Sequence, residues 1–304
     1  MWMLSLSSTT IAQTHESVPH PLSQLRVRDD VAYVRDGDPL QKCDLILPPT
    51  ATRPCPVVVL VHGGGWISGD KWTLKSIGER LAQRNVAAVV INYRLAPKDK
   101  FPAQIDDVRL AIHFVRTHAS EYGWDAERLG LLGYSAGGHL VALWQTLQDE
   151  PLTTRQAASA VSPSHPLWQS KSAARLAIAG GPPCDFRDLP PGNTSLAYWL
   201  GGSRGECPDA YRLASPASHA SQPDGPIVLI HGQADNIVPV ESSERMHREL
   251  TNSGATSRLV LVPRLGHMLT FLSPAFQKDP VNDLVQRLQS LDLPIRAGKQ
   301  PRDE

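Results

Sequence analysis

The sequence predicts an α/β fold: a mostly parallel central sheet flanked by helices. Strand-like and helix-like segments alternate along the 304 residues, which is typical of this class. Two apolar runs, Pro56–Val61 and Val86–Ile91, are continuous and rich in valine, as expected of strands buried on both faces. Glycine-rich stretches directly follow two of the strand-like runs, at 62–65 and 133–138.

In the first half of the chain we expect five strands and three helices. Pro48 and Pro49 end the second strand, because proline has no amide hydrogen for a ladder. The second helix has apolar residues at helical spacing, and Asp106 and Asp107 lie in its first turn, where negative charge complements the helix dipole. The expected strands are Val31–Val34, Lys42–Leu47, Pro56–Val61, Val86–Ile91 and Leu129–Gly133, and the expected helices are Ser76–Arg84, Ala103–His118 and Ala136–Leu147.

The second half continues the same alternation after one irregular segment. Residues 180–225 are rich in proline, glycine and serine, and they are too many for an unstructured connection, so we expect short helices that shape a pocket there. The expected strands are Leu176–Ala179, Pro226–Ile230 and Ser257–Val262, and the expected helices are Val240–Leu250 and Val281–Leu291.

Composition indicates one globular domain. Hydrophobic residues make up 41% and charged residues 20% of the chain, and 30 basic residues balance 30 acidic ones without a basic stripe, so nucleic acid is not an expected partner. We assign residues 26–293 to a single α/β domain. Residues 1–25 are expected to be a disordered tail or the remnant of an export signal, and residues 294–304 a frayed tail. No apolar run reaches 18 residues, so no membrane span is expected.

The four cysteines leave two alternatives open. They lack the C-x-x-C spacing of a zinc site, and the sequence has no H-E-x-x-H motif, so a metal site is not expected. Cys184 and Cys207 lie in one loop-rich stretch and are the more plausible disulfide pair, while four unpaired thiols are an equal alternative.

Gly133-Tyr134-Ser135-Ala136-Gly137 matches the G-x-S-x-G pattern of a nucleophile on a tight turn between a strand and a helix. Small residues two positions before and after the serine let such a turn close without a side-chain clash. The expected strand and helix flank the motif here. Ser135 is therefore the candidate nucleophile.

A second glycine motif, His62-Gly63-Gly64-Gly65-Trp66, follows the strand Pro56–Val61. The H-G-G-G pattern supplies oxyanion-hole amides in lipases and esterases. We expect the backbone N–H groups of Gly64, Gly65 and Ala136 to bind the oxyanion.

A serine hydroxyl needs a base and an acid to act as a nucleophile, and in this motif order the acid precedes the histidine. Asp235 follows the strand Pro226–Ile230, and His267 follows the strand Ser257–Val262, so both lie where the carboxyl ends of parallel strands place catalytic groups. His231 is expected to support the loop of Asp235. Asp224 precedes its strand and lies at the wrong end of the sheet.

Three further residues are candidates for substrate contact: Trp66 after the glycines, Tyr134 before the nucleophile, and His139 in the helix that follows it. For His139, packing in the core is the favoured alternative. His62 is expected to fix the glycine loop 63–65, here called the oxyanion loop, by hydrogen bonding.

Four motifs together resemble the hormone-sensitive-lipase-like and bacterial feruloyl-esterase-like carboxylesterases of the α/β-hydrolase superfamily. The resemblance covers about residues 30–290, and the motifs stand in the family's order. They are Val61 to Lys71, Asn92-Tyr93-Arg94-Leu95-Ala96-Pro97 with the later Phe101-Pro102-Ala103 and Asp106-Asp107-Val108, Gly133 to His139, and His231-Gly232 with Asp235 and Val238-Pro239.

This resemblance implies an α/β-hydrolase fold with a small cap or none. It also implies a serine carboxylic-ester hydrolase that acts without a cofactor on small acyl or aryl esters, through an acyl-enzyme intermediate. An arylformamidase or small-peptide hydrolase with the same triad is one alternative, and a non-catalytic ligand-binding protein on this scaffold is another. The sequence leaves oligomeric state and compartment open.

Overall fold

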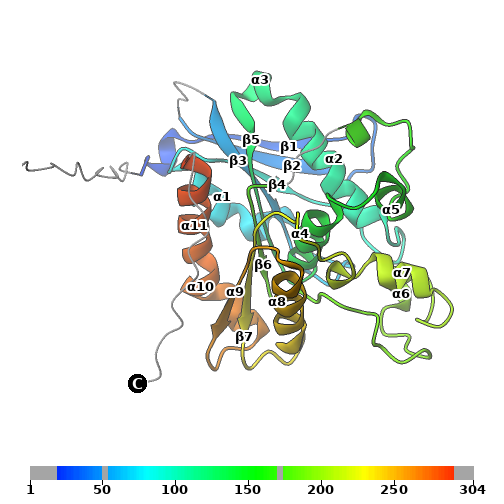
Figure 1. Ribbon diagram of the computed structural model, residues 1–304. Coiled ribbons are helices and arrows are strands. Elements are labelled where there is room, and N and C mark those ends of the chain that lie inside the picture. Colours follow the sequence, from blue (N-terminus) through cyan, green and yellow to red (C-terminus); the bar gives the residue numbers. More distant parts are fainter. Residues whose placement is uncertain (1–18, 50–53, 170–173, 291–304) are drawn as a thin grey trace, which may run out of the picture.

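Eight strands form one sheet in the order β1-β2-β4-β3-β5-β6-β7-β8 (Figure 1). The computed structural model describes residues 19–49, 54–169 and 174–290. β1 is antiparallel to β2 and β2 is antiparallel to β4, while all later neighbours are parallel. The strands are β1 (Arg26–Ala32), β2 (Lys42–Leu47), β3 (Cys55–Val61), β4 (Ala87–Ile91), β5 (Trp124–Tyr134), β6 (Leu176–Gly180), β7 (Ile227–Gly232) and β8 (Ser257–Val262).

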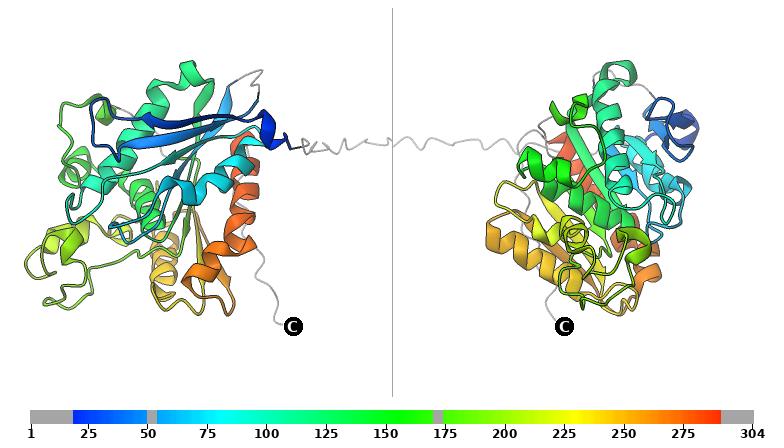
Figure 2. Two further views of the ribbon diagram at one scale, coloured as in Figure 1. Left: turned by 180° about the vertical axis from the view of Figure 1, so that it is seen from behind. Right: turned by 90° about the vertical axis from the view of Figure 1, so that its right-hand side faces the viewer.

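Helices cover both faces of the sheet. The long helices α2, α4 and α8 pack on one face, and α1 and α11 pack together on the other (Figures 1 and 2). The α-helices are α1 (Lys75–Ala82), α2 (Ala103–Thr117), α3 (Ala119–Tyr122), α4 (Ala136–Leu147), α5 (Leu152–Ala157), α6 (Ala197–Leu200), α7 (Pro208–Leu213), α8 (Glu241–Ser253), α9 (His267–Leu272), α10 (Pro274–Gln277) and α11 (Asp279–Gln289). Short 3-10 helices are η1 (Leu22–Gln24), η2 (Lys71–Leu74), η3 (Pro166–Gln169) and η4 (Pro216–Ser218).

The residue patterns explain why these elements lie where they do. All seven residues of β3 are buried, as a central parallel strand covered on both faces requires. All twelve residues of α4 are buried, so this helix runs through the core rather than along the surface. By contrast, α11 buries one stripe at helical spacing, formed by Val281, Leu284 and Leu288.

Two apolar clusters, one on each side of the sheet, hold these layers together. The larger contains the inner residues of α2, α4 and α8, and the smaller contains those of α1 and α11.

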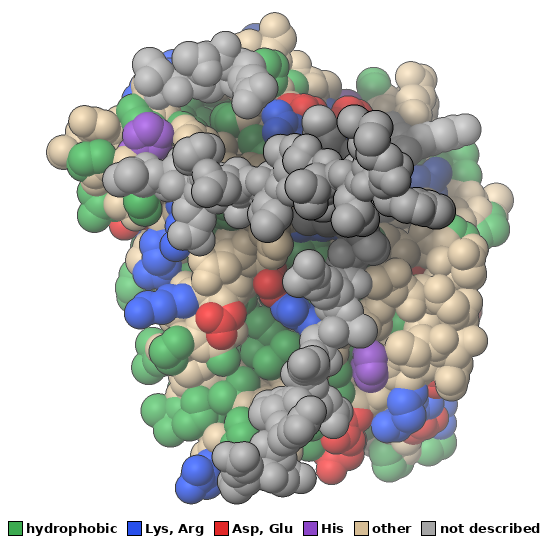
Figure 3. Space-filling view, turned by 60° about the vertical axis from the view of Figure 1, so that its left-hand side comes forward, with side chains coloured by type: hydrophobic (Ala, Val, Ile, Leu, Met, Phe, Trp, Pro, Cys, Tyr) green, Lys and Arg blue, Asp and Glu red, His purple; other side chains and the backbone are tan. Residues whose placement is uncertain are grey.

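At the surface of one face, hydrophobic side chains gather at the lower left, and charged side chains of both signs lie around them (Figure 3). None of the described helices is long and apolar enough to span a bilayer.

Several sequence expectations need correction at the edge of the sheet and in the tails. The first strand is Arg26–Ala32 rather than Val31–Val34, because its pairing with β2 begins at Arg26. Residues 19–25, assigned to the tail 1–25, include η1, and the His20 amide donates to the Gln83 carbonyl. Residues 1–18 and 291–304 lie outside the described part of the chain.

The segment 180–225 carries short helices, as expected: α6, α7 and η4. Its cysteines do not form the disulfide considered above, since Cys184 and Cys207 are free thiols, as are Cys43 and Cys55. Cys184 is fully buried, and burial raises the pKa of its thiol well above the usual range, so it stays protonated.

Candidate active site

Ser135 occupies the turn between β5 and α4 in a strained backbone conformation. Its φ of 53° and ψ of −121° are unusual for a residue with a side chain. The Ser135 amide donates to the Gly180 carbonyl at the end of β6 (2.7 Å), and the Ser135 carbonyl accepts from the His139 amide (2.8 Å). A side chain at Gly133 or Gly137 would collide with backbone atoms, which explains the small residues around the nucleophile.

The glycine loop after β3 lies directly against this turn. A Cβ added at Gly63 would be 2.9 Å from the Tyr134 carbonyl oxygen and 3.2 Å from the Ser135 Cβ. Gly64 and Gly65 have φ values of +119° and +61°, so the chain bends there through the left-handed region that favours glycine. The Gly64 carbonyl accepts from the amides of Ile67 and Ser68 and closes the bend.

His62 supports this loop, as the sequence predicted. Its Nδ1 lies 2.7 Å from the Gly63 carbonyl oxygen, and its ring stacks on Tyr93 with the centroids 4.3 Å apart. The Tyr93 hydroxyl in turn donates to the His62 carbonyl (3.1 Å). Burial lowers the pKa of His62, which keeps the ring neutral.

Asp235 and His267 form a close pair. The distance from His267 Nδ1 to Asp235 Oδ2 is 2.6 Å, and the Asp235 side chain is completely buried. The other carboxylate oxygen accepts from the amides of Ile237 and Val238, both at 2.9 Å. Burial alone would raise the pKa of Asp235, but these amides and His267 outweigh it and lower the pKa below its usual value, so the carboxylate stays charged.

His231 supports the acid rather than replacing the base. Its Nδ1 lies 2.7 Å from the Ser243 hydroxyl, and its Nε2 lies 2.9 Å from the Val238 carbonyl and 3.3 Å from Asp235 Oδ2. Burial lowers the pKa of His231 and keeps its ring neutral. The rival acid Asp224 lies before β7, at the opposite end of that strand from Asp235, and its carboxylate accepts from the Ser221 amide.

The histidine and the nucleophile turn meet at the end of β6. Ser135 is bonded to Gly180, and a Cβ added at the next residue, Gly181, would be 3.0 Å from His267 Cε1. The Tyr134 hydroxyl donates to the His267 carbonyl at 2.5 Å. The predicted serine, acid and histidine therefore come from three separate strand ends that converge on one place.

Trp66, Tyr134 and His139 lie beneath the surface of this site. Trp66 stacks on Trp199 with the centroids 3.8 Å apart, and His139 meets both rings edge-on. His139 Nε2 lies 2.7 Å from the Ala214 carbonyl oxygen, and burial lowers the pKa of His139 to about 4, so it is neutral. All three side chains are buried, and substrate contact by them stays a prediction.

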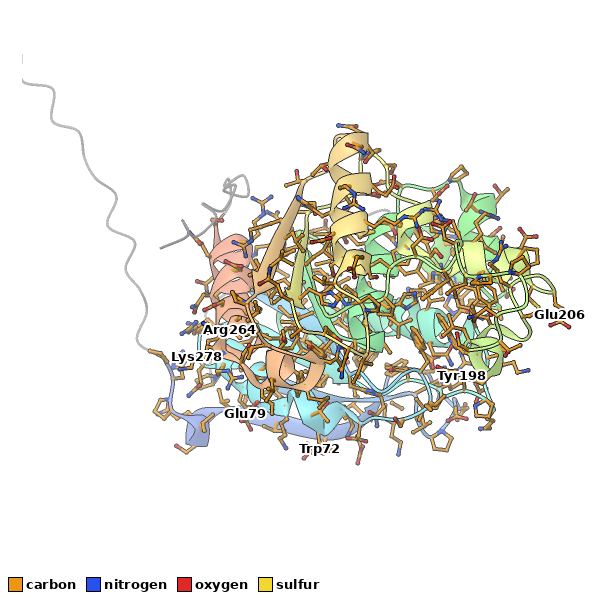
Figure 4. The ribbon with its side chains drawn as sticks, turned by 90° about the horizontal axis from the view of Figure 1, so that it is seen from below. Trp72, Glu79, Tyr198, Glu206, Arg264 and Lys278 are labelled. Atoms are coloured by element: carbon orange, nitrogen blue, oxygen red, sulfur yellow. The ribbon has the colours of Figure 1, made fainter. Side chains whose placement is uncertain are left out.

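Sequence reasoning did not identify the link between α6 and the oxyanion loop. The Tyr198 hydroxyl donates to the Gly65 carbonyl at 3.0 Å, and the Trp199 carbonyl accepts from the Phe101 amide. Figure 4 shows Tyr198 beside the cyan loops from the first half of the chain. No motif marks this contact, because it joins residues 133 positions apart. The only signal was the aromatic content of segment 180–225.

Comparisons with known proteins agree with this fold. A family model described as BD-FAE matches residues 43–250. Among curated proteins, the probable isoprenylcysteine alpha-carbonyl methylesterase ICMEL1 of Arabidopsis thaliana is 30% identical over 81% of this chain and 52% of its own length. The probable carboxylic ester hydrolase LipM of Mycobacterium tuberculosis is 31% identical over 74% of this chain and 53% of its own length. The chain thus spans about half the length of these relatives.

A solved structure, the truncated form of a carbohydrate esterase from gut microbiota, superimposes with a TM-score of 0.77. It covers 90% of this chain and 100% of its own at 24% identity, a likeness that shows the fold. The sheet order, the helices on both faces and the family match point to the same conclusion. The chain belongs to the BD-FAE family and has the α/β-hydrolase fold.

Proposed function

We propose that this protein is a serine carboxylic-ester hydrolase that acts on small acyl or aryl esters through an acyl-enzyme intermediate. The observation that carries the proposal is the buried, charged Asp235 on His267 Nδ1, held next to the strained Ser135 turn. This pairing directs the other ring nitrogen, Nε2, toward proton transfer, since Nδ1 is engaged by the acid. No group of side chains suited to a metal ion occurs among the described residues.

The reaction follows from these positions in two steps. His267 accepts the Ser135 proton as the hydroxyl oxygen attacks the ester carbonyl, and the amides of Gly64, Gly65 and Ala136 stabilise the oxyanion. His267 then protonates the departing alcohol, and the acyl group stays on Ser135. A water molecule that loses its proton to His267 releases the carboxylic acid and restores the serine.

One structural feature and the names of two similar proteins support a compact substrate. The stacked Trp66 and Trp199 rings fill the space behind the oxyanion loop, so little room is left there for a long chain. The Arabidopsis relative is named as a methylesterase and the structural neighbour as a carbohydrate esterase. On the His267 side, Met268, Leu269 and Leu272 of α9 are exposed and offer apolar contacts for an aryl or alkyl alcohol.

The decisive experiment compares p-nitrophenyl acetate, butyrate and octanoate as substrates of the wild type and of Ser135→Ala. Turnover should fall with acyl length and disappear in Ser135→Ala, while the control Ser253→Ala, on the distant end of α8, should keep wild-type rates. Folded wild type without turnover of any ester would overturn the proposal. N-formylkynurenine as a parallel substrate tests the arylformamidase alternative, which predicts faster turnover of the formamide than of the esters.

A further inference from the structure

A pocket rich in arginine lies apart from the ester site, between α2, α4, α5 and η3. Its nine lining residues include three arginines and no acidic residue. The pocket begins near Trp144, eight residues after Ala136 and therefore about 12 Å farther along α4 from the nucleophile turn. The lining residues, here called the arginine pocket, are Arg109, Ile112, His113, Arg116, Trp144, Gln148, Arg155, Leu167 and Trp168.

Arg109 is the buried base of the arginine pocket. Only 5% of it is exposed, and its Nη1 donates to Asp106 Oδ1 (2.8 Å) and to the Ala158 carbonyl (2.6 Å). Within the described part of the chain, its other terminal nitrogen, Nη2, is buried and has no hydrogen-bond partner. A buried guanidinium nitrogen without an acceptor is costly, so a ligand that supplies an acceptor there gains binding free energy.

The acid next to Arg109 already accepts three hydrogen bonds. Asp106 Oδ1 also accepts from the Ser159 hydroxyl (2.6 Å), and Asp106 Oδ2 accepts from the Ala160 amide (2.7 Å). Asp106 thus fixes Arg109 in place through Nη1, and it is not among the lining residues of the pocket.

The walls of the arginine pocket combine positive charge with apolar cover. The Arg109 guanidinium lies 5.6 Å from the centre of the Trp168 ring, and Arg155 has a buried Nε without a partner among the described residues. Burial lowers the pKa of His113, and the neighbouring His165 and Arg116 lower it further, so the ring is neutral. Burial also lowers the pKa of Arg109, and the charge of Arg155 adds to this effect. These like charges crowd one small space, which a negative ligand would relieve.

We infer that the arginine pocket binds a small oxyanion, either a carboxylate or a phosphate group, on the guanidinium groups of Arg109 and Arg155. Guanidinium groups bind the oxygens of both groups in a planar, paired geometry. The pocket is partly open and has a volume of about 20 Å³, so no more than a small charged head group would enter and the rest of an organic acid would lie at the mouth, against Trp168.

Binding can be measured without any ester substrate. The purified protein is titrated with sodium acetate, sodium benzoate and sodium phosphate, each against sodium chloride at the same ionic strength, and both the melting temperature and tryptophan emission are followed. Trp144 and Trp168 line the pocket and report on its occupancy. At least one oxyanion should raise the melting temperature saturably, while chloride does not. Acetate or benzoate as the active anion identifies a carboxylate site, and phosphate alone identifies a phosphate site.

Variants separate the arginine pocket from general charge effects. Arg155→Gln should weaken binding at least tenfold, and Arg155→Lys, which keeps the charge, should weaken it less. Arg212→Gln is the matched control, because Arg212 is a half-exposed arginine on α7 that pairs with Asp209. If Arg155→Gln does not fold, Arg155→Lys alone carries the test, with weaker binding than wild type as the expected result. Equal responses to all salts, or equal binding by wild type and Arg155→Gln, would overturn the inference.

Discussion

Asp235 accepts hydrogen bonds from two amides and lies against two histidines, of which we propose that only His267 takes part in the reaction. In His231, Nδ1 contacts the Ser243 hydroxyl, and Nε2 contacts the Val238 carbonyl and Asp235. All of these contacts are buried. His267 contacts the acid through Nδ1 alone, so its other nitrogen is available to a reacting group. The two histidines differ in their distance to Asp235 Oδ2, which is 2.6 Å for His267 and 3.3 Å for His231, and in the partners of their ring nitrogens.

The role of Asp235 is tested by Asp235→Asn. The amide keeps the shape of the side chain but cannot hold the imidazole in the required tautomer or stabilise the imidazolium, so kcat should fall by about 10⁴-fold. Hydrolysis of p-nitrophenyl acetate measures this loss, with thermal unfolding as the check on structure. Asp224→Asn, at the other end of β7, is the control and should retain wild-type kcat. A loss of less than tenfold in Asp235→Asn would mean that another acid holds His267.

Tyr198→Phe tests a residue that no motif identified. Its hydroxyl donates to the Gly65 carbonyl, so removing it loosens the oxyanion loop without touching the triad. One lost hydrogen bond of about 1 kcal/mol corresponds to a fall of about fivefold, and it should appear in kcat rather than in KM. Tyr211→Phe is the matched control, because its hydroxyl donates to the Gly202 carbonyl, within segment 180–225. If both variants lose the same activity, the contact to Gly65 has no special role.

At the residue scale, the sequence could predict the candidates Ser135, Asp235 and His267 because each follows a strand within a recognisable local pattern. Ser135 sits between two glycines, and Asp235 and His267 follow valine-, isoleucine- and leucine-rich runs. The sequence could not predict that Trp66 is buried, because its burial depends on stacking with Trp199, which lies 133 residues later in the chain. A side chain next to a motif can turn toward the substrate or toward the core, and only the packing of distant segments decides which.

Glycines let strand β3, the Ser135 turn and helix α4 pack closely through their backbones. At Gly137 an added Cβ would collide with the carbonyl oxygens of Val61 and His62, so β3 and α4 touch through backbone atoms there. The motif glycines are therefore packing requirements of the junction between strand, turn and helix, as well as conditions for the turn itself.

Gly137→Ala tests this junction. The new methyl group meets backbone oxygens that cannot move aside, so we expect destabilisation of more than about 3 kcal/mol, together with loss of activity. Thermal or urea unfolding followed by circular dichroism measures the change. The control is Gly192→Ala, where an added Cβ has no neighbour within 4 Å and stability should stay within about 0.5 kcal/mol of wild type. A stable, active Gly137→Ala protein would show that β3 and α4 can separate.

Element boundaries were predictable where the signal was local. Helix α4 was expected at Ala136–Leu147 and occupies those residues, because a glycine turn starts it and a continuous apolar sequence sustains it. Strand β5 begins at Trp124, five residues before the expected Leu129, since Cys55 pairs with Trp124 across an irregularity in register. Helix α9 starts at His267, where a loop was expected. Its apolar residues Met268, Leu269 and Leu272 are exposed, so the sequence has no pattern of one apolar and one polar helix face there.

At the scale of the whole molecule, the parallel sheet explains why a site can be assembled from distant residues. β3, β5, β6 and β7 are consecutive neighbours, and their carboxyl ends carry the oxyanion loop, Ser135, Gly181 and Asp235. The sequence predicted this shared edge from the order of its motifs. It could not predict the antiparallel pair β1 and β2 at the far edge, since two short strands give no sign of their direction.

The opposite end of the sheet contains a group that makes stability depend on pH. Asp224 is 6% exposed, and burial raises its pKa from 3.8 to about 7; the nearby charges of Asp149 and Glu150 add to the rise, while hydrogen bonds from Ser221 oppose it. An acid whose pKa is higher in the folded state keeps its proton there after the unfolded chain has lost it. The folded state is therefore favoured by this group at low pH and loses that contribution as the pH rises from about 4 to about 7.

Asp224→Asn should remove this dependence, because the amide stays neutral and can still accept from the Ser221 amide. At pH 8 the variant should melt at least about 2–4 °C above wild type, which corresponds to a gain of about 1 kcal/mol, and at pH 4 the two should melt together. Melting curves between pH 4 and 8 measure the difference. Asp209→Asn, which changes an exposed carboxylate on α7, is the control and should leave the profile of wild type unchanged. A variant that is less stable than wild type at pH 8 would show that the charged form of Asp224 is accommodated, and that its burial does not oppose folding.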